Sequence, residues 1–265
     1  MTNVNQLKVK LFADGADLDS MLVLYKDPSI KGFTTNPTLM RKASITDYEN
    51  FARKVLQVIP DRPVSFEVFA DDLKEMLVQA TVIASWGANV NVKIPITNTK
   101  AESCKDLIGT LSSKGVKINV TAMMTVDQVK TVLPGLASGA GGYVSVFAGR
   151  IADAGIDPLP VMKNVMDLLV DVPNIELIWA SPRELYNVVQ ADSIGCHIIT
   201  ATNNILKKLP TLGKDLDQFS LETVKMFLAD ATNAGFKIKI SYLFIYYFSS
   251  TSINFINNNS KVPKI

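Results

Sequence analysis

Histidine is almost absent from this chain of 265 residues, in which His197 is the single example. A zinc site or a serine–histidine–aspartate triad usually requires histidine, so neither class is a good explanation of any activity. His197 stands before two isoleucines and is interpreted as a core residue. Cysteine is nearly as scarce, and the wide separation of Cys104 and Cys196 indicates reduced thiols. Any chemistry must therefore rest on Lys, Asp, Glu, Ser, Thr, Asn and Arg side chains.

An excess of either charge is also missing, because 27 basic and 25 acidic side chains give a net charge of +2. Without a basic stripe or an acidic tail, nucleic acid and anionic membranes are poor candidates as partners. The apolar stretch at 240–248 is shorter than the roughly 20 residues that a membrane span needs. The first six residues show no apolar signal stretch. We expect a cytoplasmic protein that binds neither nucleic acid nor membrane.

Short apolar runs alternate with longer amphipathic stretches along most of the chain. The expected strands are 9–13, 32–35, 64–68, 90–94, 117–121, 143–147, 176–179 and 197–200. Between them lie helical patterns, such as Val161, Val165 and Leu168 at helical spacing. Eight such repeats over about 230 residues favour an α/β fold, a single (β/α)8 TIM barrel. An open doubly wound sheet is the alternative, but Asp14-Gly15-Ala16-Asp17 replaces its glycine-rich turn.

Three segments have the pattern of a capping box, in which a hydroxyl residue starts a helix and a Glu or Gln follows three positions later. They are Thr99–Glu102, Thr125–Gln128 and Ser181–Glu184. In the last segment, Pro182 would occupy the first helical position, where proline is favoured. Each segment is therefore predicted to begin a helix.

The composition changes near residue 236. We expect residues 1–236 to form the barrel as the catalytic domain. Residues 237–265 are rich in Lys, Ile, Tyr, Phe and Asn, and they are interpreted as an atypical low-complexity tail. Disorder is compatible with this composition, and an appended segment explains it better than a second domain does.

Lys93 stands in a short run with strong strand character, 89–95. Its apolar members share one face of the strand, while Asn89, Asn91 and Lys93 share the other. The amine then lies either at an exposed edge, which is the common situation of lysine, or inside a polar pocket. A desolvated amine is a good nucleophile that suits imine formation with a ketone.

Other polar residues share the inward parity of Lys93, and all lie near the C-terminal ends of expected strands. They are Asp14, Glu67, Asn119, Thr121 and Ser145. Barrel active sites form at these strand ends. Burying such a set without function would be costly unless every group were paired. The pattern therefore predicts a polar pocket around Lys93.

Each of these residues also has a purely structural explanation. Asp14 could cap the following helix, and Asn36 could be only a turn residue before proline. Glu67 and Lys93 could form a structural ion pair on adjacent strands. Asn119 and Thr121 could belong to a satisfied polar ladder.

Two arginines, Arg150 and Arg183, follow the sixth and seventh expected strands. Barrel phosphate sites commonly form from late loops and the start of a helix, and Ser181 lies at such a start. The arginine fork suits phosphate oxygens. Alternatively, Ser181 only caps the helix, and Arg150 pairs with Asp153 or Asp157.

Taken together, these segments resemble the transaldolase family over residues 9–236. The matching segments are Phe12-Ala13-Asp14, Thr34-Thr35-Asn36-Pro37, Val64-Ser65-Phe66-Glu67-Val68, Val92-Lys93-Ile94-Pro95, Asn119-Val120-Thr121, Val144–Arg150 and Trp179–Glu184. No single segment is specific to that family, but the occurrence of all of them in this order is.

The resemblance implies roles for individual residues. Lys93 would form an imine with a ketose, and Glu67 and Thr121 would hold a water for the accompanying proton transfers. Asp14 would take the proton of the C4 hydroxyl as the C3–C4 bond breaks. The implied substrate-binding residues are Asn36, Asn119, Ser145, Phe147, Arg150, Ser181 and Arg183.

The resemblance further implies transfer of a dihydroxyacetone unit between sugar phosphates in the pentose phosphate pathway, without a metal or cofactor. A homo-oligomer is also expected. Related fructose 6-phosphate aldolases release free dihydroxyacetone, but they typically carry Gln at the position of Glu67 and Tyr at that of Phe147. Both positions side with transaldolase. A non-catalytic sugar-phosphate-binding barrel is the third alternative, and the intact lysine and acid set argues against it.

Overall fold

The computed structural model of the protein describes residues 4–238. The chain divides into two compact units, which cover residues 1–213 and 214–265. Among residues 4–238, all strands and all residues of the expected site lie in the first unit.

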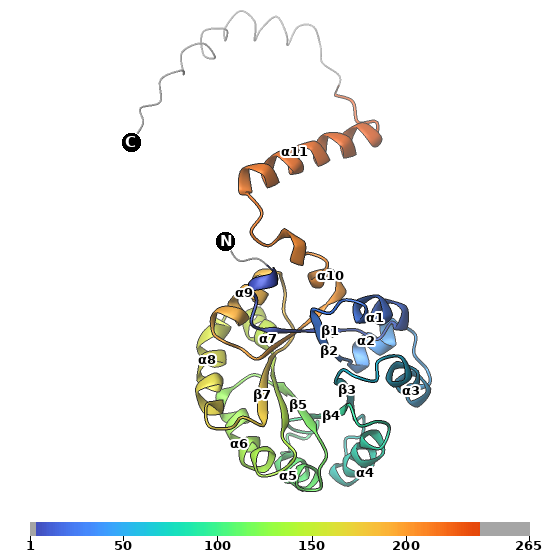
Figure 1. Ribbon diagram of the computed structural model, residues 1–265, viewed down its shortest axis with the longest axis vertical. Helices are drawn as coiled ribbons and strands as arrows, with labels where there is room; N and C mark the ends of the chain where they lie inside the picture. Colours follow the sequence, from blue (N-terminus) through green and yellow to red (C-terminus); the bar gives the residue numbers. More distant parts are fainter. Residues whose placement is uncertain (1–3, 239–265) are drawn as a thin grey trace, which may run out of the picture. The chain divides into compact units, whose positions relative to one another are not determined.

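Eight parallel strands form the centre of the first unit. They close into a barrel in chain order, with β1 also paired to β8 (Figure 1). The strands are β1 Lys10–Asp14, β2 Ile30–Thr34, β3 Val64–Glu67, β4 Val90–Pro95, β5 Ile118–Met123, β6 Gly142–Val146, β7 Ile175–Trp179 and β8 Ile198–Thr202. The predicted TIM barrel is confirmed, and the open sheet is excluded.

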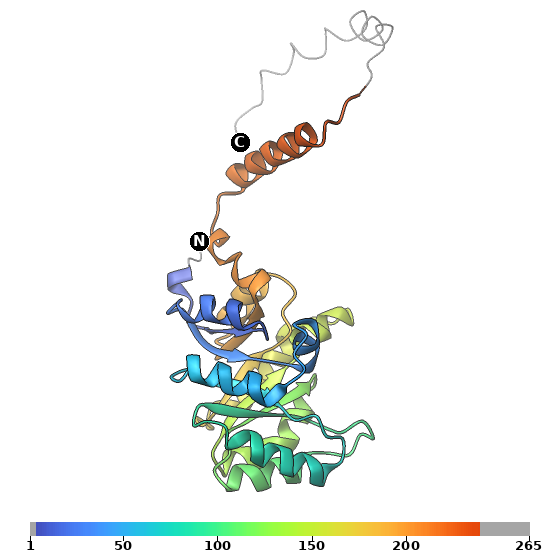
Figure 2. The ribbon, with the colours of Figure 1, turned by 90° about the vertical axis from the view of Figure 1, so that its right-hand side faces the viewer.

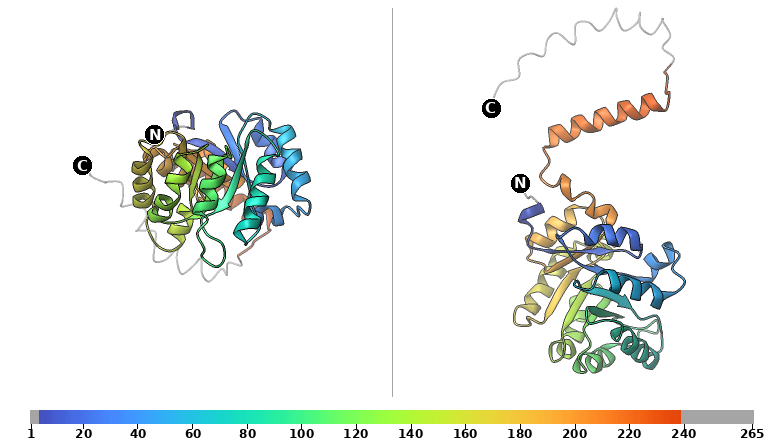
Figure 3. Two further views of the ribbon diagram at one scale, coloured as in Figure 1. Left: turned by 90° about the horizontal axis from the view of Figure 1, so that it is seen from below. Right: turned by 45° about the vertical axis from the view of Figure 1, so that its right-hand side comes forward.

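Helices surround the barrel, as Figures 1 and 3 show from different directions. They are α1 Leu18–Tyr25, α2 Pro37–Lys42, α3 Tyr48–Val58, α4 Leu73–Ala84, α5 Lys105–Ser113, α6 Val126–Ala137, α7 Ala148–Asp153, α8 Pro158–Leu169, α9 Tyr186–Ser193 and α10 Asn203–Leu206. Several begin at an aspartate whose carboxylate accepts a backbone N–H of the first turn, as Asp17 does before α1 and Asp47 before α3. The helix predicted from the spacing of Val161 and Val165 is α8, which buries Val165.

One predicted helix start is confirmed and two are wrong. Thr125 caps α6 with the full reciprocal capping box. Thr99 starts no helix, because its N–H and hydroxyl donate to Asp71, while Asn98 binds the N–H groups of residues 100 and 102. These contacts fold the segment as a loop, and α5 begins only at Lys105. Ser181 also starts no helix, for reasons given with the site below.

Two separate apolar clusters lie on opposite faces of the barrel wall. The larger one lies between strands and helices and includes Phe66, Val92 and Val120. The smaller one fills the barrel interior with Phe12, Ile178, Ala180 and Ile198, and Tyr143 and Phe147 pack against it. Tyr143 and Phe147 have the same parity along the chain as Ser145, which is predicted to point inward, so the expected assignment of strand faces holds here. Full burial of one such apolar side chain stabilises the fold by about 1.5–3 kcal/mol.

The second unit contains α11, Leu216–Asn233, one continuous helix (Figure 2). Asp215 caps it, and none of its residues is buried. The contacts assign α11 to this unit, whereas the boundary expected from composition falls at residue 236. That boundary stays a prediction, because residues 239–265 of the expected tail lie outside the described residues.

Candidate active site

The C-terminal ends of the strands open into a cavity of about 470 Å³. The expected site residues that line it are Asp14, Asn36, Glu67, Lys93, Thr121, Ser145, Phe147, Arg150, Ser181 and Arg183. Asn119 is the exception. Residues from five strands and from the segments that follow β2, β6 and β7 therefore meet at one place, because the barrel brings all carboxyl ends of its strands to the same face.

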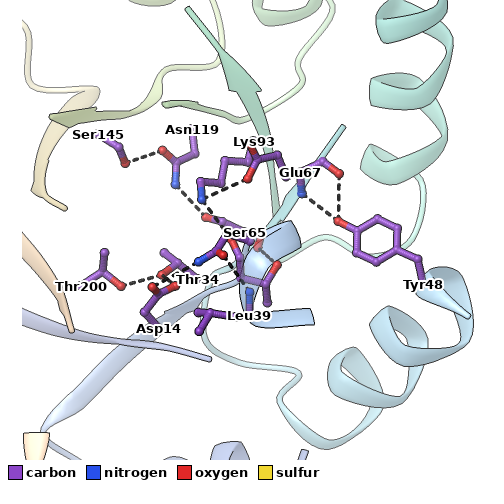
Figure 4. A network of polar contacts seen from close by, with 12 residues as sticks. Asp14, Thr34, Leu39, Tyr48, Ser65, Glu67, Lys93, Asn119, Ser145 and Thr200 are labelled. Carbon is purple, nitrogen blue, oxygen red and sulfur yellow. Dashed lines mark hydrogen bonds and ion pairs between the residues drawn. The ribbon is translucent and has the colours of Figure 1, made fainter. Parts of the chain in front are cut away.

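Lys93 lies on β4 with only 6% of its surface exposed, which excludes the surface-lysine interpretation. Its Nζ atom donates to the backbone carbonyl of Thr35 at 3.0 Å and lies 3.2 Å from Oε2 of Glu67 (Figure 4). Glu67 and Lys93 are register partners on β3 and β4, so strand pairing brings the two side chains together. The ion pair expected as an alternative does exist, and it lies on the cavity wall.

Asp14 ends β1, two strands along the barrel wall from Glu67 on β3. Thr34 donates to its Oδ1 at 2.8 Å, and the Thr34 hydroxyl also lies 2.6 Å from that of Thr200. Burial raises the pKa of Asp14 above its ordinary value, while the positive charge of Lys93 and the Thr34 hydrogen bond oppose this shift. Asp14 is not a helix cap, since Asp17 has that function for α1.

Asn36 combines two roles. Its Oδ1 accepts the N–H of Leu39 and caps α2, and its Nδ2 points to Oδ2 of Asp14 at 3.4 Å. Pro37 occupies the first position of that helix, where its missing N–H costs nothing. The turn therefore also places an amide beside the carboxylate.

Asn119 lies beneath the cavity and is fully buried. Its amide donates to the Ser65 hydroxyl at 3.0 Å and accepts from Ser145 at 2.7 Å (Figure 4). This is the polar ladder considered as an alternative for Asn119. Ser145 is thereby held on the cavity wall by a side chain that does not reach the cavity itself.

Thr121 has a buried hydroxyl that finds no hydrogen-bond partner within residues 4–238. The next residue, Ala122, has a φ of 61°, where the pairing of β5 with β6 becomes irregular. A non-glycine residue in this region costs of the order of 1–3 kcal/mol and is characteristic of functional sites. The hydroxyl is thus left available for a molecule in the cavity.

Two arginines lie on the far side of the cavity. Arg183 forms a two-pronged ion pair with Asp153 and also donates to the carbonyl and hydroxyl oxygens of Ser181 at 2.9 and 2.8 Å. This hydrogen-bonded ion pair keeps the pKa of Asp153 below its ordinary value. Arg150 forms no ion pair in the part of the chain that the structure describes, so the expected pairing with Asp153 belongs to Arg183 instead.

The predicted helix start at Ser181 is wrong. Ser181 has a φ of 60°, and α9 begins only at Tyr186. The N–H groups of Arg183 and Glu184 donate to the side chain of Asn187, at 2.7 and 3.2 Å. The N–H groups of Arg183 and Glu184 are therefore already bonded, and they do not form the free helix start that was expected to bind an anion.

The charge of the cavity wall is mostly positive. Two carboxylates, Asp14 and Glu67, face four cationic side chains, which are Lys42, Lys93, Arg150 and Arg183. Such a surface favours anionic ligands. Within the described residues, no group of three or more His, Cys, Asp or Glu side chains is arranged to hold a metal ion.

Several contributors were missed by the sequence reasoning. Thr34 at the end of β2 and Thr200 in the middle of β8 have the inward parity, and this signal could have identified them. Lys42 lines the cavity from the last turn of α2. The Thr35 carbonyl leaves no signal in the sequence, because every residue carries one.

The site combines a buried amine, a carboxylate beside it, a second carboxylate at the end of β1 and several cationic side chains on one cavity wall. This set can form an imine with a carbonyl compound, move protons at two points and hold an anionic group. All of these groups line the same cavity. Within the described residues, no helix is both long and apolar enough to cross a membrane.

Comparison with known proteins identifies the family of this chain. The chain matches the family described as Transaldolase/Fructose-6-phosphate aldolase over residues 11–244. A "Probable transaldolase" of Dehalococcoides mccartyi is 34% identical over 202 residues, which cover 76% of this chain and 90% of the relative. Another "Probable transaldolase", from Thermoanaerobacter sp., is 33% identical over 232 residues, covering 87% of this chain and all of the relative.

The solved structures share only the fold with this chain. Dihydrodipicolinate synthase from Rhodopseudomonas palustris has a TM-score of 0.56 and 14% identity, with 87% of this chain and 81% of that one covered. The match over residues 11–244 and the identities of 33–34% decide the family. The chain belongs to the transaldolase/fructose-6-phosphate aldolase family.

Proposed function

We propose that the protein is a transaldolase that transfers a dihydroxyacetone unit through a Schiff base on Lys93. The donor is fructose 6-phosphate or sedoheptulose 7-phosphate, and the acceptor is erythrose 4-phosphate or glyceraldehyde 3-phosphate. The observation that carries the proposal is the buried Lys93 amine, 3.2 Å from Glu67 on the wall of a cationic cavity.

Imine formation is the first step. The Lys93 amine, with its proton passed to Glu67, attacks the C2 ketone of the donor to give a carbinolamine. The hydroxyl of that intermediate leaves as water after protonation, and a protonated imine remains. Glu67 is adjacent to the nitrogen, and the free hydroxyl of Thr121 can hold a water for these proton transfers.

Bond cleavage follows at Asp14. Asp14 accepts the proton of the C4 hydroxyl, the C3–C4 bond breaks, and its electron pair moves into the imine to form an enamine. An aldose phosphate leaves. The enamine then attacks the aldehyde of the acceptor, Asp14 returns the proton to the new hydroxyl, and water hydrolyses the imine. The elevated pKa of Asp14 brings this carboxylate nearer to the range useful for a general base.

The remaining residues hold the substrate. Asn36 and Ser145 lie on the cavity wall, where they can bind the dihydroxyacetone hydroxyls, and Phe147 flanks them. Arg150, Ser181 and Arg183 are proposed to bind the phosphate. Direct binding by Asn119 stays a prediction, because its amide contacts Ser65 and Ser145.

Covalent trapping tests this proposal. Borohydride added together with fructose 6-phosphate should attach a reduced dihydroxyacetone unit to the peptide that contains Lys93, because reduction fixes the imine. Lys93→Met should abolish both the label and turnover. Lys42→Met removes the other lysine of the cavity and should retain the label. Labelling that persists in Lys93→Met would contradict the assignment.

A fructose 6-phosphate aldolase is the second candidate, since the family includes both activities. Glu67 and Phe147 favour transfer, so release of free dihydroxyacetone without an acceptor should be slow compared with transfer. An enzymatic assay for dihydroxyacetone, with and without erythrose 4-phosphate, measures both rates. Release as fast as transfer would assign the chain to the aldolases.

We further propose that the protein works in the cytoplasm within the pentose phosphate pathway, as a homo-oligomer without metal or cofactor. A non-catalytic barrel is disfavoured because the lysine and both carboxylates are present and lie on one cavity.

A further inference from the structure

The backbone of Glu67 has no paired strand on the side of β2. β2 pairs with β3 only through Phe33 with Val64 and Thr34 with Ser65, and then gives way to α2. Alternate residues of a parallel strand direct their N–H and C=O groups to the same neighbour. The backbone groups of Ser65 face β2, because its carbonyl accepts the N–H of Thr35. The next residue whose backbone groups face that side is Glu67. The Glu67 N–H and C=O groups thus face the side of β2, at a level that β2 does not reach.

The hydroxyl of Tyr48 takes the place of the missing strand. It accepts the N–H of Glu67 at 2.8 Å and donates to the carbonyl of Glu67 at 3.0 Å (Figure 4). Tyr48 is the first residue of α3, directly after the cap Asp47. One side chain therefore satisfies both main-chain groups of Glu67.

An aromatic cluster holds the Tyr48 ring in position. Its centroid lies 4.4 Å from that of Phe69, 5.5 Å from Trp86 and 6.1 Å from Phe66. Burial raises the pKa of the Tyr48 phenol, so the group keeps its proton at neutral pH. The phenol can therefore donate its proton to the Glu67 carbonyl at neutral pH.

We infer that Tyr48 is a positioning residue for the proton transfers at Lys93, acting through Glu67. The inference deepens the proposed function and rests on it. The Glu67 carboxylate reaches Lys93 at 3.2 Å, and within residues 4–238 Tyr48 is the one partner of the backbone N–H and C=O groups of Glu67 on the β2 side. Proton transfer needs this separation to be kept within hydrogen-bond reach. Removing the hydroxyl frees the segment that carries the carboxylate.

The test is a double-mutant cycle between Tyr48→Phe and Glu67→Gln. The readouts are the rate constant of borohydride trapping with saturating fructose 6-phosphate, kcat and KM. General acid–base catalysis contributes about 10²–10⁴-fold, so Tyr48→Phe should lower the trapping rate constant about tenfold with little change in KM. In the Glu67→Gln background the same change should have almost no effect, because the group that Tyr48 positions is gone.

Tyr25→Phe is the matched control. It removes a tyrosine hydroxyl bonded to Asp61 at the surface, and the trapping rate constant should equal that of the wild type. Partial unfolding of Tyr48→Phe would lower the labelled fraction and not the rate constant, and the folded fraction is measured by circular dichroism.

The possible results separate the two hypotheses. A wild-type rate constant in Tyr48→Phe, or the same loss in both backgrounds, would overturn the positioning role while leaving the proposed function intact. If the wild-type protein forms no adduct at Lys93, the proposed function fails and the role of Tyr48 fails with it.

Discussion

Replacing Gly149 with alanine should open the phosphate side of the cavity. A Cβ atom at this position would lie 2.8 Å from the carbonyl carbon of Ser181, closer still to its oxygen, and 3.3 Å from the guanidinium carbon of Arg183. Favourable carbon–carbon contacts lie at about 3.5–4.0 Å. The turn at Ser181 and the start of α7 must therefore separate by about 1 Å.

The size of the effect follows from this displacement. A misplacement of about 1 Å can cost about 10² in rate, so kcat/KM for fructose 6-phosphate should fall by about that factor. The loss should be much smaller for fructose, which has no phosphate to hold. Overpacking of this kind also lowers the free energy of unfolding by about 1–3 kcal/mol.

Steady-state kinetics on both sugars and urea unfolding measure these effects. Gly109→Ala is the control, since its Cβ would meet nothing closer than Gly135 at 3.6 Å. In the interior of α5 this control should leave activity unchanged and raise stability by about 0.5–1 kcal/mol. Unchanged kinetics of Gly149→Ala with fructose 6-phosphate would refute the phosphate site at Ser181 and Arg183.

Two further predictions concern pH. Thr34→Val removes a hydrogen bond that lowers the pKa of Asp14, so the acid limb of the kcat profile should move to higher pH, and an unmoved limb would argue against Asp14 as the base. Burial lowers the pKa of His197 below 6.5, and its Nδ1 accepts the N–H of Leu177. The unfolded chain therefore binds a proton at His197 more readily than the folded chain does. Neutral His197 should contribute fully to the free energy of unfolding above pH 6.5, and urea unfolding should show the loss of this contribution as the pH falls below that value. His197→Phe should reduce the slope of the free energy of unfolding against pH below pH 6.5. An unchanged slope would contradict the assignment of this pH dependence to His197.

The barrel and most of the cavity wall could be predicted because strand alternation maps directly onto the two faces of a closed sheet. Glu67 and Lys93 share one parity on neighbouring strands, and the register places them side by side. The same reasoning failed to separate Asn119 from its neighbours, because parity fixes the face of a residue and not its depth. Asn119 therefore lies below the cavity, bonded to Ser65 and Ser145.

The local signals failed where distant residues supplied competing hydrogen bonds. The helix expected at Thr99 gives way to bonds with Asp71, which lies in the preceding strand-to-helix loop. At Ser181, a residue with positive φ and the side chain of Asn187 replace the predicted cap. Tyr48 was not foreseen for a related reason, because the need for it arises only when β2 ends before β3.

The Thr35 carbonyl that accepts from Lys93 has a consequence for how such an enzyme can change. No amino-acid replacement at position 35 deletes that oxygen, so this anchor of the nucleophile persists through any drift of side chains. Glu67, by contrast, can be exchanged by a single substitution. Variation among relatives should thus alter the proton-handling partner of the lysine while the lysine itself stays in place.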